Sequence, residues 1–340
     1  MAAFVPSQFL PDAVLARLTD LRVSDPERVV RAAGARKRRA TLTLDGRLNV
    51  LAADHPARRV TAVGEDPLAM ADRRDYLARV VRVLLAPSVD GVMATMDILE
   101  DLLLLDGLLC EAGAPPLLEG RLLIASLNRG GLSGASWELD DRITGATPAA
   151  CAERGLDGAK LLLRLCDEEA ASLETMAAAA RAISELNHLR LPAFLEALPV
   201  VRAGDRYEVC RDAAALARTA GVASALGDSS RYLWLKLPYC EGFERVARAT
   251  TLPILILGGE ATGGPAPLLR QVAAALAAGP NVRGAMIGRN TLYPGDGDPL
   301  ALAEAFGRLI HERCDPTTAA AVIAEQSWRN MDAITRWLKG

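Results

Sequence analysis

Short apolar runs alternate with longer amphipathic stretches along almost the whole chain. The runs are rich in Leu, Ile, Val and Ala and have the length of β-strands. They lie at 48–53, 91–96, 121–127, 158–163, 192–199, 232–237, 253–257 and 284–287. In the stretches between them, apolar residues recur at three- and four-residue spacing, which predicts helices. Examples of these helical stretches are 72–85, 168–185 and 267–278.

The strand runs are apolar throughout instead of alternating with polar residues, which is typical of a parallel sheet covered by helices. Eight such strand–helix units in succession predict an α/β fold of the (β/α)8 type, the TIM barrel. A doubly wound open sheet would show the same alternation, but no GxGxxG motif follows the first strand. The barrel is therefore the favoured fold.

We predict a single domain that covers residues 1–340 and carries extra helices at both ends of the chain. The barrel is expected at about 45–310, after N-terminal helices within 1–44. These first helices are expected to cap the bottom of the barrel or to make an oligomer contact. The C-terminal helices cover 299–340 and are predicted at 299–313 and 317–338.

The composition is that of a globular enzyme with a large core. Hydrophobic residues make up 51% of the chain and charged residues 24%, which argues against disorder. The net charge of −3 gives no reason to expect binding to nucleic acid or to an anionic membrane. No apolar run reaches membrane-spanning length, and the first residues lack the basic and apolar regions of a secretory signal. We therefore expect a cytoplasmic enzyme.

The six cysteines and three histidines show no spacing that would suit a metal ion. There is no CxxC pair, no HxxxH pair and no HxH pair. This pattern argues against a metal hydrolase. The sequence predicts no metal site and no cofactor.

Lysine is rare in this chain, and two of its copies lie inside apolar strands. Of the 39 Lys plus Arg residues, only four are lysine: Lys37, Lys160, Lys236 and Lys339. A desolvated lysine can lose its proton and become a nucleophile, whereas arginine stays protonated near neutral pH. The positions of Lys160 and Lys236 therefore indicate amine chemistry. The alternative is that each lies at the end of a strand and extends its charge to water.

Polar residues interrupt the apolar runs mainly at the carboxyl ends of the strands, where barrel enzymes carry their active sites. With the glycines that follow strands seven and eight, the candidate site residues are, in chain order, Asp54, His55, Asn128, Lys160, Arg164, Glu196, Lys236, Gly258, Gly259, Gly288 and Arg289. Ser126 and Arg129 also lie at the end of the third strand run. The glycines would offer backbone N–H groups to an anion, and Arg289 would add a charge-assisted contact. Loops after strands seven and eight often bind phosphate in barrels. The alternative for the glycines is two ordinary tight turns.

Lys236 and Glu196 form a chemically coherent pair on neighbouring strands. A neutral amine condenses with a ketone to an iminium, and an acid/base must move protons during that step. Glu196 would serve this role with a pKa raised by desolvation. Lys160 would keep Lys236 neutral by like-charge repulsion or bind substrate hydroxyls. The alternative for Glu196 is a carboxylate that is merely paired with Lys160 or Arg164.

Six segments carry a resemblance to a known group of enzymes. They are Ala-Ala-Asp54-His55, Gly-Ala-Lys160-Leu-Leu-Leu, Phe-Leu-Glu196, Leu-Trp-Leu-Lys236-Leu-Pro, Leu-Gly258-Gly259 and Ile-Gly288-Arg289-Asn290. Over about 45–295 the chain resembles the class I, Schiff-base aldolases of the (β/α)8 type. The nearest group comprises tagatose-bisphosphate, sulfofructose-phosphate and archaeal-type fructose-bisphosphate aldolases. Two departures are Arg164 and Cys166 where this group often has tyrosines, and Pro56 where the archaeal type usually has glycine.

The resemblance implies a role for each matching residue. Lys236 would form the imine, Glu196 would be the acid/base, and Lys160 would assist them. Asp54 would orient the lysine or the substrate. A phosphate clamp would consist of Gly258, Gly259, Gly288 and Arg289, with His55, Asn128 and Arg164 as further substrate-binding residues.

The implied activity is that of a lyase that cleaves or forms a C–C bond in a phosphorylated keto sugar. The chain also resembles an actinobacterial barrel subfamily associated with inositol catabolism. This suggests 2-deoxy-5-keto-gluconate 6-phosphate, split to dihydroxyacetone phosphate and malonate semialdehyde, as a candidate substrate. A homo-oligomer is expected. The alternatives are an acyl- or aldehyde-transferring enzyme of thiolase or transaldolase type, and a non-catalytic barrel that binds sugar phosphates.

Overall fold

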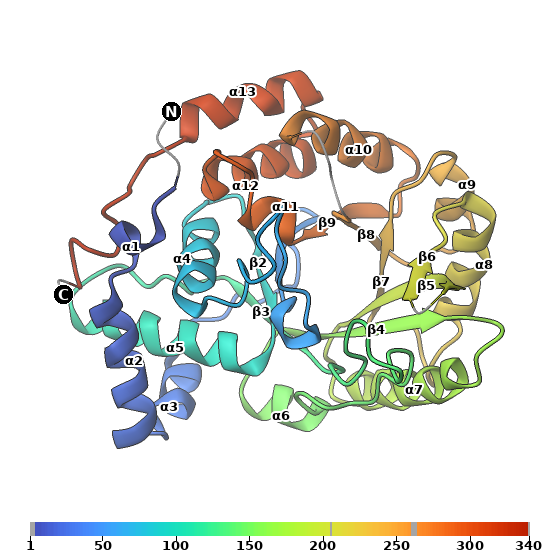
Figure 1. Cartoon of the computed structure of the whole chain (residues 1–340), viewed down its shortest axis with the longest axis horizontal. Helices are drawn as coiled ribbons and strands as arrows, with labels where there is room; N and C mark the ends of the chain where they lie inside the picture. The colour runs from blue at the N-terminus through green and yellow to red at the C-terminus, as the bar shows by residue number, and fades with distance from the viewer. Residues whose placement is uncertain (1–3, 205, 260–263, 339–340) are drawn as a thin grey trace.

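Eight parallel strands close into a barrel in the computed structural model, which describes residues 4–204, 206–259 and 264–338 (Figure 1). The strands are β1 (Leu48–Ala53), β2 (Gly91–Ala94), β3 (Leu122–Ser126), β4 (Gly158–Leu165), β5 (Ala193–Ala203), β7 (Leu233–Pro238), β8 (Ile254–Leu257) and β9 (Val282–Ile287). Neighbours in this series pair in parallel, and β9 pairs with β1 to close the ring. The predicted TIM barrel is confirmed.

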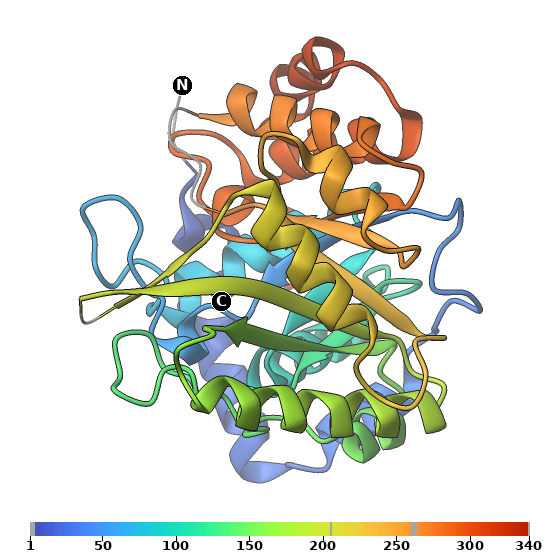
Figure 2. The same ribbon diagram turned by 90° about the vertical axis from the view of Figure 1, so that its right-hand side faces the viewer.

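Helices connect the strands and surround the barrel (Figures 1 and 2). They are α4 (Arg73–Leu84), α5 (Met96–Glu111), α6 (Pro148–Glu153), α7 (Ala171–His188), α8 (Ala213–Ser224), α9 (Phe243–Arg248), α10 (Pro265–Ala277), α11 (Arg289–Leu292) and α12 (Pro299–Gly307). Several begin at a side chain that accepts a backbone N–H, as Asp72 does for α4 and Asp212 for α8. Within the described residues, no helix is long and apolar enough to cross a membrane.

The inside of the barrel is filled in layers because side chains alternate between the two faces of each strand. An apolar layer consists of Leu48, Val50, Ala52, Met93, Leu122, Ile124, Phe194, Leu255 and Met286. Two residues beyond Phe194, the same alternation turns Glu196 inward, and two beyond Trp234 it turns Lys236 inward. The charged residues therefore lie on the carboxyl-end side of the apolar layer, at the mouth of the barrel.

The N-terminal helices do not cap the barrel bottom. α1 (Pro6–Phe9), α2 (Asp12–Ser24) and α3 (Arg28–Ala35) pack on the outside, against α4 and α5. The segment that follows them performs the expected capping. Its Arg36 pairs with Asp157 at 2.9 Å, ahead of β4, and its Leu42 packs against the apolar layer inside the barrel.

Two elements differ from the prediction. The short strand β6 (Arg206–Val209) was missed, and it pairs in antiparallel orientation with the end of β5 to form a hairpin (Figure 2). The predicted helix 317–338 is wrong beyond Gln326, where α13 (Pro316–Gln326) ends. Trp328 and Asn330 have φ angles of 66° and 53°, which a right-handed helix excludes.

The predicted helix 299–313 is divided in two. It consists of α12 followed by a π-helical turn, η2 (Arg308–Glu312). Asp298 caps the start of α12 by accepting the N–H of Leu300 and also accepts the N–H of Trp328 at 2.7 Å. The carboxylate of Asp298 thus joins α12 to the irregular C-terminal segment.

Asp298 also forms a fully buried ion pair with Arg82 on α4. Arg82 donates from Nε at 2.9 Å and from Nη2 at 2.6 Å, and both side chains are 0% exposed. Removing the carboxylate would leave a buried guanidinium without its counter-ion. We expect Asp298→Ala to lower the free energy of unfolding by about 3–5 kcal/mol in urea denaturation. Asp140→Ala, which removes an exposed pair with Arg142, should cost less than about 1 kcal/mol. Equal effects would contradict this assignment.

Candidate active site

A chain of alternating charges crosses the mouth of the barrel. Lys236 Nζ lies 3.0 Å from Glu196 Oε2, and Lys160 Nζ lies 2.6 Å from the same oxygen. On its other side, Lys160 Nζ is 3.3 Å from Asp54 Oδ2. The side chains of Lys160 and Lys236 are only 2% and 6% exposed. Neither lysine extends its charge to bulk water, so that alternative is wrong for both.

Two residues at the end of the third strand, which were not among the predicted site residues, hold Asp54 in place. Ser126 Oγ donates to Asp54 Oδ2 at 3.0 Å and accepts from Arg129 Nε at 2.8 Å. The guanidinium of Arg129 also pairs directly with Asp54. Ser126 pairs in register with Lys160 across β3 and β4. Ser126 could have been predicted as a site residue, because two polar residues at matching positions of neighbouring strands are expected to lie side by side.

The expected rise in the pKa of Glu196 is wrong. Burial acts strongly in that direction, but the two ammonium groups of Lys160 and Lys236 outweigh it and hold the pKa well below its ordinary value. Asp54 behaves in the same way, because Arg129 and Lys160 outweigh its burial. Both carboxyl groups are therefore ionised at neutral pH and can accept a proton.

The surroundings of Lys160 change the pKa of its ammonium group. Burial, followed by the nearby charges of Arg129 and Lys236, lowers its pKa to about 8, although Asp54 and Glu196 oppose this shift. A lysine with this pKa exchanges its proton readily near physiological pH. Because its ammonium lies between two carboxylates, Lys160 can return a proton that Glu196 has passed on.

A cavity of about 570 Å³ opens above Lys236 and Glu196. Its wall also includes the predicted residues His55, Gly258, Gly259, Gly288 and Arg289, which come from the ends of β1, β8 and β9. The fold thus gathers seven of the eleven predicted site residues around one space. Lys160 and Asp54 lie behind Glu196, outside the cavity wall.

Neighbouring groups lie so close to the backbone at the ends of β8 and β9 that only glycine fits there. A Cβ on Gly288 would lie 2.2 Å from His55 Cε1 and 2.4 Å from the carbonyl oxygen of Ala52. Gly259 has a φ angle of +57°, and the Arg211 guanidinium lies 3.2 Å from the position of its missing Cβ. Any larger residue would therefore displace groups that line the cavity.

Three arginines that sequence reasoning missed also line this cavity. Arg206 lies on β6 and Arg211 follows it, so both depend on the hairpin that the apolar pattern did not predict. Arg58 lies on the short 3₁₀ turn after β1 and donates from Nε to the Gly131 carbonyl at 3.0 Å. Burial, together with the nearby charges of Arg164 and Arg129, lowers the pKa of Arg58 to about 10. The wall is therefore strongly cationic.

His55 contributes a neutral ring to this wall. Its burial, reinforced by the charges of Lys236 and Arg289, lowers its pKa to about 4, while Asp54 opposes the shift. The imidazole is therefore uncharged at neutral pH. It packs against Gly288 and can hold a substrate oxygen without adding a further positive charge.

Asn128 and Arg164 lie away from the cavity. Asn128 bridges two strands, because its Nδ2 donates to the Leu162 carbonyl at 2.6 Å and its Oδ1 accepts the Leu162 N–H at 2.8 Å. Arg164 pairs with the Glu138 side chain and donates to the carbonyl of that residue. Both residues hold the loop after β3 in place, and the structure brings neither into the cavity wall.

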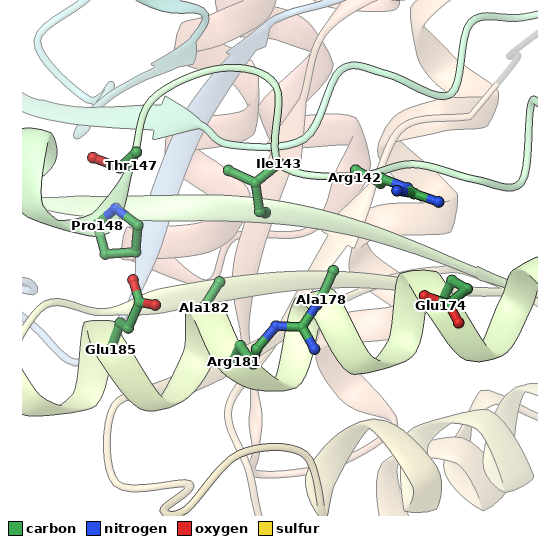
Figure 3. Close-up of a pocket in the computed structure, with 9 residues that line it drawn as sticks. All are labelled: Arg142, Ile143, Thr147, Pro148, Glu174, Ala178, Arg181, Ala182 and Glu185. Atoms are coloured by element: carbon green, nitrogen blue, oxygen red, sulfur yellow. The ribbon is translucent and has the colours of Figure 1, made fainter.

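A second hollow, of about 300 Å³, lies between the segment 142–148 and α7 (Figure 3). Arg142 faces Glu174 and Arg181 across it, so its charges are mixed. It contains no buried lysine or other nucleophile. Among the described residues, no group of three or more His, Cys, Asp or Glu side chains could hold a metal ion.

The fold and the site define a (β/α)8-barrel protein with two buried lysines and a carboxylate at its mouth. The chain belongs to the Cgl0159-like family, whose model matches residues 46–306. The crystal structure of Cgl0159 from Corynebacterium glutamicum is 38% identical, covers 90% of this chain and 99% of its own, and has a TM-score of 0.83. No curated protein sequence gives a significant match.

Two aldolase structures share the fold at lower identity. One is an archaeal fructose-1,6-bisphosphate aldolase with its catalytic lysine covalently bound to the carbinolamine intermediate; it is 19% identical, covers 83% of this chain and 99% of its own, and has a TM-score of 0.59. The other is a Schiff-base-forming fructose-1,6-bisphosphate aldolase, also 19% identical, with coverages of 83% and 100% and a TM-score of 0.61. At this identity, the likeness shows the barrel fold.

Proposed function

We propose that this protein is a class I aldolase, which cleaves or forms a C–C bond in a phosphorylated keto sugar through an imine on Lys236. The observation that carries this proposal is the buried pair of Lys236 and Glu196, 3.0 Å apart at the floor of a cationic cavity. Support comes from the archaeal aldolase of the same fold, in which a lysine holds the carbinolamine intermediate.

Imine formation begins when the Lys236 ammonium passes a proton to the Glu196 carboxylate 3.0 Å away, and the amine that results attacks the ketone carbon of the substrate. A C–N bond forms, the ketone oxygen gains a proton, and the carbinolamine then loses water to give an iminium. Glu196 is within hydrogen-bond distance of Lys236 Nζ and carries the protons that these steps exchange. The low pKa of Glu196 keeps it ionised before the first proton transfer.

Cleavage then draws on the iminium as an electron sink. The Glu196 carboxylate removes the proton of the hydroxyl two carbons from the iminium carbon. The electron pair of the C–C bond moves into the iminium, the aldehyde leaves, and an enamine remains on Lys236. Protonation and hydrolysis of the enamine release the ketone product and restore the amine.

Lys160 and Asp54 support this chemistry from behind the cavity. Lys160 fixes the orientation of the Glu196 carboxylate at 2.6 Å and can replace the proton that Glu196 gives away. Asp54, held by Ser126 and Arg129, keeps Lys160 in place at 3.3 Å. Both act through Glu196 and are positioning residues.

The substrate phosphate is proposed to bind where β8 and β9 end. Gly258, Gly259 and Gly288 let the backbone approach it closely, while Arg289 and Arg211 supply positive charge. The wider cationic wall suits a phosphorylated substrate. The keto sugar acid phosphate 2-deoxy-5-keto-gluconate 6-phosphate of inositol catabolism is our candidate, on the strength of the sequence resemblance.

Arg289→Ala is expected to weaken binding of phosphorylated substrate by about ten- to a hundredfold, because a hydrogen bond to a charged partner is worth about 1.5–3 kcal/mol. The change should appear in KM, and inorganic phosphate should compete with substrate in the wild type but much less in the variant. Borohydride trapping at Lys236 should survive at high substrate concentration. An unchanged KM would place the phosphate elsewhere.

Activity is expected to be insensitive to EDTA. The proposed iminium is itself the electron sink, so the C–C bond can break without a Lewis acid. The measurement is the cleavage rate before and after dialysis against EDTA. A tenfold loss that zinc restores would contradict the lysine mechanism.

The proposed function is tested by product analysis with a panel of keto-sugar phosphates. Each candidate is incubated with the protein, and dihydroxyacetone phosphate and the released aldehyde are measured with and without coenzyme A. We expect one substrate to be cleaved equally well in both cases. A product that forms only with coenzyme A would assign the site to acyl transfer. Binding of every candidate without turnover would favour a non-catalytic barrel.

A further inference from the structure

A further hollow, lined by arginines, lies at the opposite end of the barrel from the candidate active site. It is distinct from the hollow beside α7. It encloses about 1010 Å³ between the turns that precede β8 and β9 and the segments around Arg47 and Arg313. Pro253 and Asn281 in its wall immediately precede these strands, and Arg47 immediately precedes β1. Because all barrel strands are parallel, these amino ends face away from the mouth that contains Lys236.

Four arginines from different segments line this hollow. They are Arg47 before β1, Arg248 at the end of α9, Arg283 in β9 and Arg313 after η2. Within the described ranges, none of their guanidinium groups forms an ion pair with a carboxylate. Burial and the nearby charges of Arg313 and Arg283 lower the pKa of Arg47, and Asp45 offsets only part of this shift. Arg47 also donates from Nη1 to the Ile310 carbonyl at 2.8 Å, and the hollow as a whole carries net positive charge.

Other arginines at this end of the barrel are neutralised by carboxylates. Arg36 and Arg38 both pair with Asp157 at 2.9 Å, and Arg39 pairs with Asp90 at 2.8 Å. These three arginines therefore form ion pairs, whereas in the hollow Asp45 is near Arg47 without an ion pair between them within the described residues. Helix-dipole complementation accounts for Arg248 in the last turn of α9, but the other three arginines do not lie in an α-helix.

The wall of the hollow also lacks a feature that would repel an anion. The C-terminal end of α9 would normally expose carbonyl oxygens here. Asn281 Nδ2 donates to the carbonyl of Ala247 in this helix and to those of Thr250 and Leu252 in the loop that follows it, at 3.0, 2.9 and 3.2 Å. These hydrogen bonds engage the three carbonyl oxygens and fix the wall of the hollow beside its arginines.

We propose that this hollow binds a small polyanion, a molecule with two or more phosphate or carboxylate groups. Several arginines that line one space match such groups better than a single anion. The site is separate from the candidate active site, and the proposal does not depend on the proposed function. From this hollow, β1 and β9 run to the mouth of the barrel, where Asp54 follows β1 and Arg289 lies two residues after β9, so a bound polyanion is placed to influence activity.

Isothermal titration with inorganic pyrophosphate and with citrate tests this site, and the two probes separate phosphate from carboxylate recognition. The mouth could also bind pyrophosphate, so the titration is repeated in the double variant Arg211→Ala, Arg289→Ala. We expect this variant to keep one binding event for at least one probe. When Arg283→Gln and Arg313→Gln are added to the double variant, its affinity for that probe should fall about ten- to a hundredfold.

The matched control is Arg245→Gln, which removes an exposed arginine on α9 that does not line the hollow and should leave the affinity unchanged. Thermal melting confirms that each variant is folded. Absence of binding in the mouth variant, or binding that survives the loss of Arg283 and Arg313, would overturn the proposal. So would a change in sedimentation on replacing these arginines without a change in ligand affinity, since the hollow would then be a subunit contact.

Discussion

Lys236→Arg is expected to abolish turnover as completely as Lys236→Ala, with a loss of at least about ten-thousandfold in kcat. Arginine keeps the positive charge next to Glu196 but cannot attack a ketone, because its guanidinium stays protonated. The comparison therefore separates a nucleophilic lysine from one that serves only as a charge. The measurement is the steady-state cleavage rate of a substrate identified in the keto-sugar panel.

The control for this substitution is Lys37→Arg, which changes an exposed lysine paired with Glu119. It should leave the rate within about twofold, since exposed ion pairs contribute little. Retention of a tenth or more of the activity in folded Lys236→Arg would show that this amine is not the nucleophile. A correctly folded variant is recognised by an unchanged thermal melting midpoint.

The second large effect is expected for Glu196→Gln. A positioned acid/base contributes about a hundred- to ten-thousandfold to the rate, and glutamine keeps the shape of glutamate without its proton-accepting oxygen. We expect kcat to fall by that factor, while slow imine formation on Lys236 remains detectable by trapping. The control is Glu174→Gln, which lies at the hollow between the segment 142–148 and α7 and should not change kcat.

Glu196→Gln also removes the carboxylate between two buried lysines, so the variant is compared with Glu196→Ala by thermal melting. If both variants fold and Glu196→Gln retains more than a third of the wild-type kcat, another group moves the protons. In that case His55, which lines the same cavity and is neutral, would be the next candidate.

The barrel could be predicted because parallel, buried strands have apolar residues on both faces. The first strand was predicted at 48–53 and is observed as Leu48–Ala53. The hairpin strand Arg206–Val209 was missed because it lies outside the barrel and is partly exposed, so its residues carry no continuous apolar run. The segment after Gln326 buries Ile334 and Leu338 at helix-like spacing, yet the positive φ angles of Trp328 and Asn330 end the helix.

Part of the site followed from the sequence for a related reason. Glu196 and Lys236 lie on strands that pair directly, so matching positions in two apolar runs indicated their contact. Arg211 and Arg129 could not be found in this way, because each lies in a loop whose path depends on tertiary packing. The pKa of Glu196 was predicted in the wrong direction because burial was expected to outweigh the charges of Lys160 and Lys236, which lie 2.6 and 3.0 Å from its carboxylate.

The most direct test of the account is reduction of the covalent intermediate. The protein is incubated with dihydroxyacetone phosphate and sodium borohydride, digested, and analysed by peptide mass spectrometry. The account predicts one modified peptide, with the reduced three-carbon phosphate on Lys236 and none on Lys160. Modification of Lys160 instead, or no modification by any keto-sugar phosphate of the panel, would contradict it.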